Sequence, residues 1–132
     1  MTAKISVLSV GLEPTLIDFA DHAYDAFPGM TAQKVQSGLD TEMRTLNAMG
    51  YDAELCLTDF GATAEAVVRA RLEHKRYDCV AIGAGVRTIG KNFLLFEKLL
   101  NVVHAHAPQA KICFNTGPTD TAEAVQRWVP KP

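Results

Sequence analysis

The sequence predicts a single α/β domain built on a small, parallel, doubly wound sheet. Two observations carry this prediction: four short, largely apolar runs, and helical patterns that lie between them. Strands that are apolar along their whole length are typical of a parallel sheet covered on both faces. Strands that alternate with helices pair in parallel through right-handed crossovers. We expect about four strands in the order 2-1-3-4 with helices on both faces, as in Rossmann-like and flavodoxin-like domains.

The first part of the chain contains one strand and a long connection. The run 4–10 is apolar and strand-like, and the connection 11–51 is about twice as long as one crossover helix requires. Its second half, 31–49, has the three- and four-residue apolar spacing of a helix, and Gly50 follows as a stop. Its first half, 13–30, has similar spacing before a Pro-Gly pair interrupts it. The sequence leaves open whether this half forms a short helix or an ordered loop.

The remainder of the chain alternates strand and helix three times. In chain order the expected elements are strand 53–58, helix 63–75, strand 78–84, helix 91–106, strand 111–116 and helix 120–128. The sequence Thr-Ala-Glu-Ala-Val occurs at 63–67 and again at 121–125, which indicates that one strand-turn-helix arrangement is used twice. Asp120 followed by Glu123 is typical of a capping box at the start of the last helix.

Length and composition favour one domain, 1–132, with its own hydrophobic core. Of the 132 residues 48% are hydrophobic, and 13 basic side chains against 15 acidic ones give a net charge of −2. A domain of this length buries roughly two thirds of its unfolded surface, and no linker or low-complexity tract divides it. Nucleic-acid binding is not expected, because domains with that function usually carry a basic excess.

Apolar segments and cysteines indicate where the protein resides. No segment is apolar over the ~18 residues that a membrane-spanning helix needs, and the first residues lack a signal-peptide cleavage region. We therefore expect no membrane partner and a cytoplasmic location. Cys56, Cys79 and Cys113 are far apart and lie within apolar runs, so we expect core residues. No close cysteine pair with metal-ligand spacing is present, and no metal site is predicted.

A ligand site is expected at the carboxyl ends of the strands, where the winding direction of the sheet reverses. With the order 2-1-3-4 this point lies between the first and third strands, in loops that contain Gly11, Glu13, Gly83, Gly85 and Arg87. Glycine permits close approach of the backbone to a ligand, the start of a helix favours an anion, and arginine binds phosphate or carboxylate through two hydrogen bonds. The alternative is that Gly83 and Gly85 only let the strand turn beneath a helix.

Asp59, Asn115 and Thr116 lie in the other two loops of this edge and complete the predicted ligand-binding set. Such hydroxyl and amide groups either contact a polar ligand or cap the following helix, and we favour capping. Glu13 and Asp59 are the candidate acid/base groups, with Arg87 to stabilise an anion. Neither a nucleophile elbow nor a phosphate-binding loop with its lysine is present. The sequence therefore assigns no catalytic residues and no cofactor, and it does not decide whether the protein is an enzyme.

The expected helix 91–106 is more hydrophobic than packing on one sheet face requires. Most of its apolar residues span an arc of roughly 180°, whereas packing on a sheet uses a stripe of about 100°. The apolar side chains outside that stripe, at Phe93, Leu94 and Leu100, need a further surface to cover them, either a neighbouring helix of the same chain or a second copy of the protein. We expect a homo-oligomer through this helix, with Trp128 either closing the last helix onto the sheet or joining the interface.

A series of short segments, mostly in the second half of the chain, carries a resemblance to a known family. They are 77–80, 82–87, 94–97, 101–104, 106–108, 114–116 and 120–128, with Glu13-Pro14 and Pro28-Gly29 from the long connection. Together they resemble a small family of bacterial α/β proteins of unknown function. The resemblance implies a Rossmann-like fold and an ordered loop over 13–30, and it implies no chemistry.

Two functions from different classes are compatible with the sequence. The first is a Rossmann-like protein that binds a small anionic ligand, bearing phosphate or carboxylate, at the carboxyl edge of the sheet. The second is a non-catalytic, self-associating interaction or regulatory module, which the surplus on the helix 91–106 favours.

Overall fold

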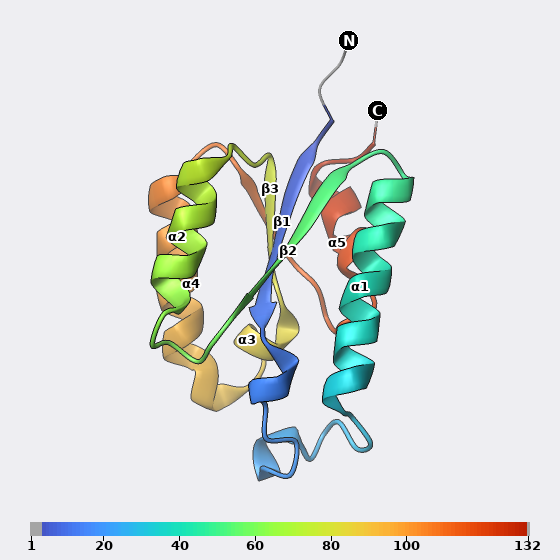
Figure 1. Cartoon of the computed structure of the whole chain (residues 1–132), viewed down its shortest axis with the longest axis vertical. Helices are drawn as coiled ribbons and strands as arrows, with labels where there is room; N and C mark the ends of the chain where they lie inside the picture. Colours follow the sequence, from blue (N-terminus) through green and yellow to red (C-terminus); the bar gives the residue numbers. More distant parts are fainter. Residues whose placement is uncertain (1–3, 132) are drawn as a thin grey trace.

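The computed structural model describes residues 4–131 and contains one parallel sheet with helices on both faces (Figure 1). Its strands are β1 (Ser6–Leu12), β2 (Asp52–Thr58), β3 (Cys79–Ile82) and β4 (Lys111–Phe114), hydrogen-bonded in the order β2-β1-β3-β4. All three pairings are parallel, and Val10 lies beside both Cys56 and Ile82. The predicted class and the predicted strand order are therefore confirmed.

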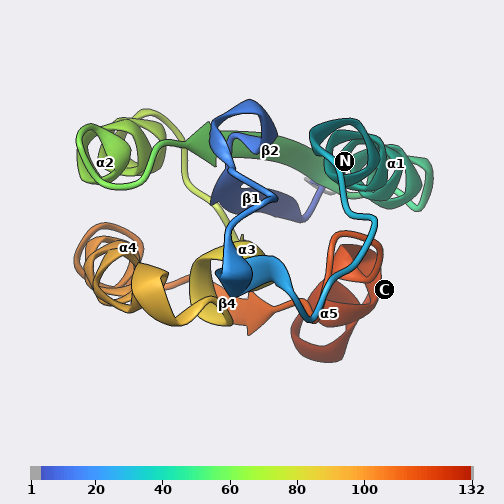
Figure 2. The ribbon, with the colours of Figure 1, turned by 90° about the horizontal axis from the view of Figure 1, so that it is seen from below.

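Helices connect the strands and cover both faces of the sheet. They are α1 (Ala32–Ala48), α2 (Ala64–His74), α3 (Ala84–Arg87), α4 (Phe93–His106) and α5 (Thr121–Trp128). Helices α2 and α4 lie side by side on one face, and α1 and α5 lie on the other (Figure 2). Because each crossover returns the chain to the start of the next strand, all four strands end at the same edge. This carboxyl edge lies at the bottom of Figure 1.

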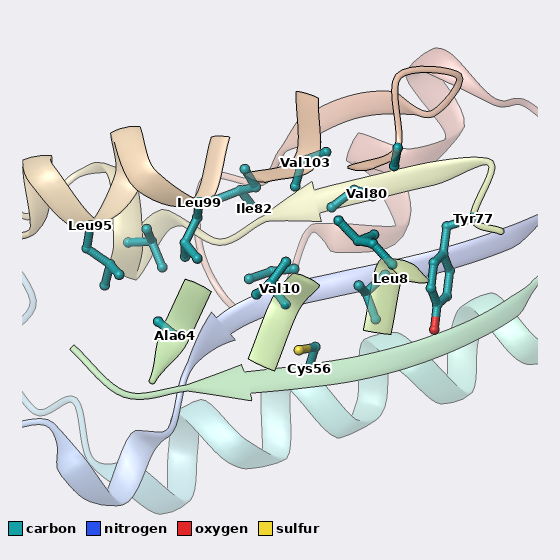
Figure 3. Packing of buried hydrophobic residues seen from close by; sticks show 14 of the residues in the cluster. Leu8, Val10, Cys56, Ala64, Tyr77, Val80, Ile82, Leu95, Leu99 and Val103 are labelled. Carbon is teal, nitrogen blue, oxygen red and sulfur yellow. The ribbon is translucent and has the colours of Figure 1, made fainter. Parts of the chain in front are cut away.

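The core consists of two hydrophobic clusters, one on each face of the sheet. Successive side chains of a strand point to opposite faces, so Leu8 and Val10 pack toward α2 and α4 (Figure 3), whereas Val7 packs toward α1 and α5. Cys56 belongs to the first cluster, and Cys79 and Cys113 to the second; all three are buried and free. The prediction that the cysteines are core residues is confirmed.

The predicted boundaries differ from the observed ones mainly at the carboxyl edge. Strand β3 ends at Ile82, because the Gly83 carbonyl accepts hydrogen bonds from the backbone N–H groups of Val86 and Arg87 and starts α3. Strand β4 likewise ends at Phe114, two residues earlier than predicted. Strand β1 extends two residues further than predicted, to Leu12.

Helix α1 begins and ends as the sequence predicts. The Thr31 hydroxyl accepts a hydrogen bond from the backbone N–H of Lys34 at 3.1 Å. At the other end Gly50 has a φ of +102°, and the backbone N–H of Tyr51 donates to the Leu46 carbonyl. Only glycine adopts such a φ without strain, so this residue terminates the helix.

The long connection after β1 is an ordered loop, which confirms one of the two predicted alternatives. Residues 13–30, called the 13–30 loop below, contain only two single turns of 3₁₀-helix, Pro14–Leu16 and His22–Tyr24. The loop lies beyond the ends of the strands, at the bottom of Figure 1, before the chain enters α1.

Side chains bond the open backbone groups of both outer strands. On β2, the side-chain amide of Asn47 donates to the Ala53 carbonyl at 3.2 Å and accepts from the Ala53 N–H at 2.9 Å. On β4, the Arg127 guanidinium donates to the Phe114 carbonyl at 2.8 Å. The helix before β2 and the helix after β4 thus supply partners that a further strand would otherwise provide at these positions.

The apolar surplus of α4 is partly resolved within the chain. Leu100 is partly buried against the cluster that α2 shares with α4, whereas Phe93 and Leu94 are 60% and 59% exposed. The expectation that Trp128 closes the last helix onto the sheet is wrong, since this side chain is 55% exposed. It stands at the end of α5, on the sheet face opposite α4. Among residues 4–131 no helix has the length and apolarity to cross a membrane.

Candidate ligand pocket

A pocket of about 110 Å³ lies at the carboxyl edge, where the ends of β1 and β3 meet the 13–30 loop. Its walls are mostly apolar side chains from the loop and from α1: Ile17, Phe19, Tyr24, Phe27, Met30, Val35 and Leu39. The sheet and the following turns contribute Gly11, Leu12, Gly83, Ala84, Gly85, Thr88, Ile89 and the segment 115–118. The pocket therefore occupies the point of the fold where the winding direction reverses.

Five of the eight predicted ligand-binding residues line this pocket: Gly11, Gly83, Gly85, Asn115 and Thr116. A Cβ atom added at Gly83 would lie 3.4 Å from the backbone oxygen of Val10, which is an ordinary van der Waals distance, so this position does not require a glycine. The other three predicted residues, Glu13, Asp59 and Arg87, are outside the pocket lining.

Asn115 joins three parts of the carboxyl edge through its buried side chain. Its Oδ1 accepts a hydrogen bond from the backbone N–H of Ala84 at 2.7 Å, and its Nδ2 donates to the Thr121 hydroxyl at 2.9 Å. The ends of β3 and β4 and the start of α5 are thereby fixed to one another. The backbone N–H of Ala84, which an anion in this turn would otherwise use, is already bonded.

Carboxylates of the chain itself occupy the backbone N–H groups in the other two loops. Asp59 accepts hydrogen bonds from the Thr63 hydroxyl and from the backbone N–H groups of Gly61 and Thr63, and these bonds lower its pKa. Asp120 accepts in the same way from the Thr116 hydroxyl and from the N–H groups of Thr116 and Gly117. Burial opposes ionisation of Asp120, but these hydrogen bonds outweigh it and lower the pKa of the carboxyl group.

The predicted capping box at Asp120 is wrong, because its carboxylate turns back toward Thr116 instead of capping the helix that follows. A different residue bonds the first turn of α5: Glu42 of α1 accepts from the backbone N–H of Ala122 at 3.0 Å. Asn115 and Thr116 bond the turns around them and also line the pocket, so the preference for capping over ligand binding stays a prediction.

Arg87 holds the end of β4. Its guanidinium lies over the Phe114 ring, 4.8 Å from the ring centroid, and donates a hydrogen bond to the Asn115 carbonyl. Burial lowers the pKa of Arg87, against the opposing effect of Asp120. Its Nε is buried without a hydrogen-bond partner among the described residues. A bidentate contact to an anion would compete with both existing interactions.

Glu13 and Thr58 lie at the start of the 13–30 loop. The backbone N–H of Glu13 donates to the Thr58 carbonyl at 2.8 Å, and the Thr58 hydroxyl donates to the Gly11 carbonyl at 3.1 Å. The Oε2 atom of Glu13 is buried and has no hydrogen-bond partner in the part of the chain that the structure describes. Glu13 thus retains an unengaged carboxylate oxygen, unlike Asp59.

The residues that sequence reasoning missed are the apolar ones of the 13–30 loop. Their three- and four-residue spacing was the available signal, and it was compatible with a helix as well as with a loop. In the structure these side chains form the pocket wall, with the Phe19 and Tyr24 rings 5.4 Å apart. Among residues 4–131 no group of three or more histidine, cysteine or acidic side chains is arranged to hold a metal ion.

The fold and the pocket define an open α/β protein with a small, mainly apolar pocket at its switch point. The chain matches no protein-family model and no curated protein. The resemblance to a bacterial family therefore stays a prediction, and the function is argued from the pocket.

Proposed function

We propose that the protein binds a small molecule whose compact apolar body fills the pocket beneath the 13–30 loop. The observation that carries this proposal is the apolar pocket itself, at the place where open α/β proteins bind their ligands. An apolar cavity of about 150 Å³ holds one benzene molecule. A pocket of about 110 Å³ is smaller, so it is suited to a short branched chain, and a benzene ring would extend beyond it into the pocket mouth.

A phosphate or carboxylate group on this ligand belongs at the rim of the pocket. An unpaired charge among apolar side chains is strongly unfavourable, and the Asp120 carboxylate beside Thr116 repels an anion on that side. The exposed residues Gly85 and Thr88 form the opposite part of the lining and leave such a group in contact with water. The acidic group predicted from the sequence is thus compatible with the pocket only as a peripheral head group.

Nuclear magnetic resonance titration tests the proposal with defined probes. We expect 3-methylbutanoate, benzoate and their neutral amides to shift the backbone N–H signals of Gly83, Gly85 and Gly117, while those of α2 stay unchanged. No shift of the pocket signals at millimolar concentrations of any of the four probes would refute the proposal.

Two further comparisons sharpen this experiment. Val35→Phe places a larger side chain in the pocket wall and should abolish the shifts, whereas Val67→Phe on the outer face of α2 should leave them unchanged. Tighter binding of the acids than of the amides would support an anionic head group. Equal binding of acid and amide would exclude it and leave an uncharged ligand.

The exposed start of α4 favours self-association as a second candidate function. Phe93 and Leu94 are adjacent and both more than half exposed, which is unusual for large apolar side chains unless another surface covers them. Native mass spectrometry at micromolar concentration should then show a dimer that the double substitution Phe93→Ser, Leu94→Ser converts to a monomer. A monomer in the unsubstituted protein would exclude this function.

A further inference from the structure

We infer that the 13–30 loop is a lid that opens as one unit to admit the ligand, and that the ion pair between Asp21 and Lys91 is its latch. The inference rests on the proposed function for its purpose, because a lid serves a pocket that is filled and emptied. Its physical basis is the way the loop is attached to the rest of the molecule.

The loop forms a large part of the pocket wall. Ile17, Phe19, Tyr24 and Phe27 all line the pocket. The body of the protein supplies the rest of the wall, from the end of β1, the segment 83–89, the segment 115–118 and α1. A ligand that fills this volume lies against the inner side of the loop. Displacing the loop therefore opens the pocket without moving the sheet.

Hydrogen bonds in the middle of the loop are almost entirely internal. The backbone N–H groups of Tyr24 and Phe27 donate to carbonyls three residues earlier, and the Asp21 side chain accepts from the N–H of Ala23 at 2.8 Å. Among the described hydrogen bonds of residues 14–28, one alone reaches outside the loop: Lys91 Nζ donates to Asp21 Oδ2 at 2.6 Å. Opening thus breaks no hydrogen bond of a strand or helix.

The ends of the loop are the natural hinges. At the first end the bond from the Glu13 N–H to the Thr58 carbonyl holds the chain to β2, and Pro14 follows directly. At the second end Gly29 has a φ of +78°, and its carbonyl accepts from Lys34 Nζ at 2.8 Å. The segment between these two fixed points is the part that moves.

The closed position carries an unfavourable contribution from Tyr24. This side chain is only 7% exposed, and its hydroxyl is buried without a hydrogen bond of good geometry within the described chain. Burial raises the pKa of Tyr24, and the nearby Asn92 side chain opposes that rise without replacing a well-formed bond. Water would solvate the hydroxyl once the loop opens, so opening regains a hydrogen bond that the closed state lacks. The apolar contacts and the latch oppose this gain.

Hydrogen–deuterium exchange of the free protein tests the lid without any ligand. In the unsubstituted protein, amides of residues 14–28 should exchange far faster than those of β1 and β3. Lys91→Gln and Asp21→Asn should each raise loop exchange about two- to fivefold, the range for a partly exposed ion pair. Tyr24→Phe should lower it about fivefold or more, because it removes the unpaired hydroxyl.

Asp25→Asn is the matched control, since this substitution removes the same charge from the same loop. Among residues 4–131 Asp25 pairs with His22 alone, three residues away, so its substitution should leave loop exchange unchanged. Loop amides that exchange no faster than β1 would overturn the lid, because the loop would then open only with global unfolding. Equal exchange in Asp21→Asn and Asp25→Asn would overturn the latch. Neither result depends on the titrations above, so failure of the lid and failure of ligand binding are distinguishable.

Discussion

Glu54 on the outer strand β2 is the centre of an ionic cluster that joins β2 to α2. Its Oε1 accepts a hydrogen bond from Lys75 Nζ at 2.6 Å, and its Oε2 accepts from Arg71 at 2.8 Å and from the Tyr77 hydroxyl at 2.7 Å. Lys75 also donates to Asp52 at 2.7 Å. We predict that Glu54→Gln, which keeps the shape of the side chain and removes its charge, destabilises the protein at pH 7.

The size of the expected loss of stability follows from the pKa of the Glu54 carboxyl group. The Lys75 hydrogen bond is the largest cause that lowers the pKa of Glu54 from 4.5 to about 2, burial opposes it, and the bonds from Tyr77 and Arg71 add to it. A fall of this size corresponds to about 3 kcal/mol. The side chain is 33% exposed, so screening by water reduces the expected contribution to about 1–2 kcal/mol.

The sign of the pH dependence is set by a pKa that is lower in the folded state. Ionised Glu54 stabilises the folded protein above pH 4.5, and this contribution is lost as the pH falls from about 4.5 toward 2. Urea denaturation of both proteins should therefore show a difference of about 1–2 kcal/mol at pH 7 that shrinks below pH 4. Glu97→Gln on the exposed side of α4 is the control and should be neutral. Equal stability of Glu54→Gln and the unsubstituted protein at pH 7 would refute the reasoning, as would a difference that persists at pH 2.

Three further substitutions test the packing around the pocket and the sheet edge. Gly38→Ala places a Cβ atom 3.0 Å from the Pro118 carbonyl oxygen, and this overpacking costs about 1–3 kcal/mol, of which the better helix propensity of alanine in α1 offsets about 1 kcal/mol. The free energy of unfolding should therefore fall by about 1–2 kcal/mol, whereas Gly117→Ala meets no atom within 4 Å and should be close to neutral in the same thermal denaturation. Asn115→Leu removes two buried hydrogen bonds and should cost about 2 kcal/mol or more in urea denaturation, with equal midpoints counting against the role described for this amide. Asn47→Leu should destabilise by about 1 kcal/mol and speed amide exchange at Ala53; unchanged exchange there would contradict its bonding role.

The sheet could be predicted from the sequence because its signal is local. Each strand is an apolar run flanked by helical patterns, and the parallel order follows from their alternation. The predicted strand ends were wrong where a turn competes with the strand: Gly83 and Ala84 are small, and Asn115 and Thr116 directly continue an apolar run, so local sequence does not exclude a longer strand. Only the hydrogen bonds made at the end of the neighbouring strand decide that they turn instead.

The position of the candidate pocket could be predicted from the sequence, but its apolar lining could not. Strand order alone places it at the carboxyl edge, and five predicted residues line the observed pocket. Its apolar nature depends on the 13–30 loop folding back over that edge, which apolar spacing does not distinguish from a helix. The contact of the Arg87 guanidinium with the Phe114 ring could not be predicted either, because the two residues are 27 positions apart in the chain and adjacent only in the fold.

The carboxylate of Asp120 shows a second limit of local patterns. A capping box and a carboxylate that bonds the preceding turn require the same residue types near the start of a helix. The sequence around Asp120 satisfies both, and the structure uses the second. Distinguishing them requires the direction of the side chain, which residue spacing does not supply.

The bonded outer strands determine how this protein can meet other polypeptides. An extended peptide that adds to a sheet gains its affinity from the open backbone groups of an edge strand. At Ala53 and Phe114 such a peptide would first have to displace Asn47 or Arg127. Strand addition is therefore penalised at these two positions, one on each edge of the sheet.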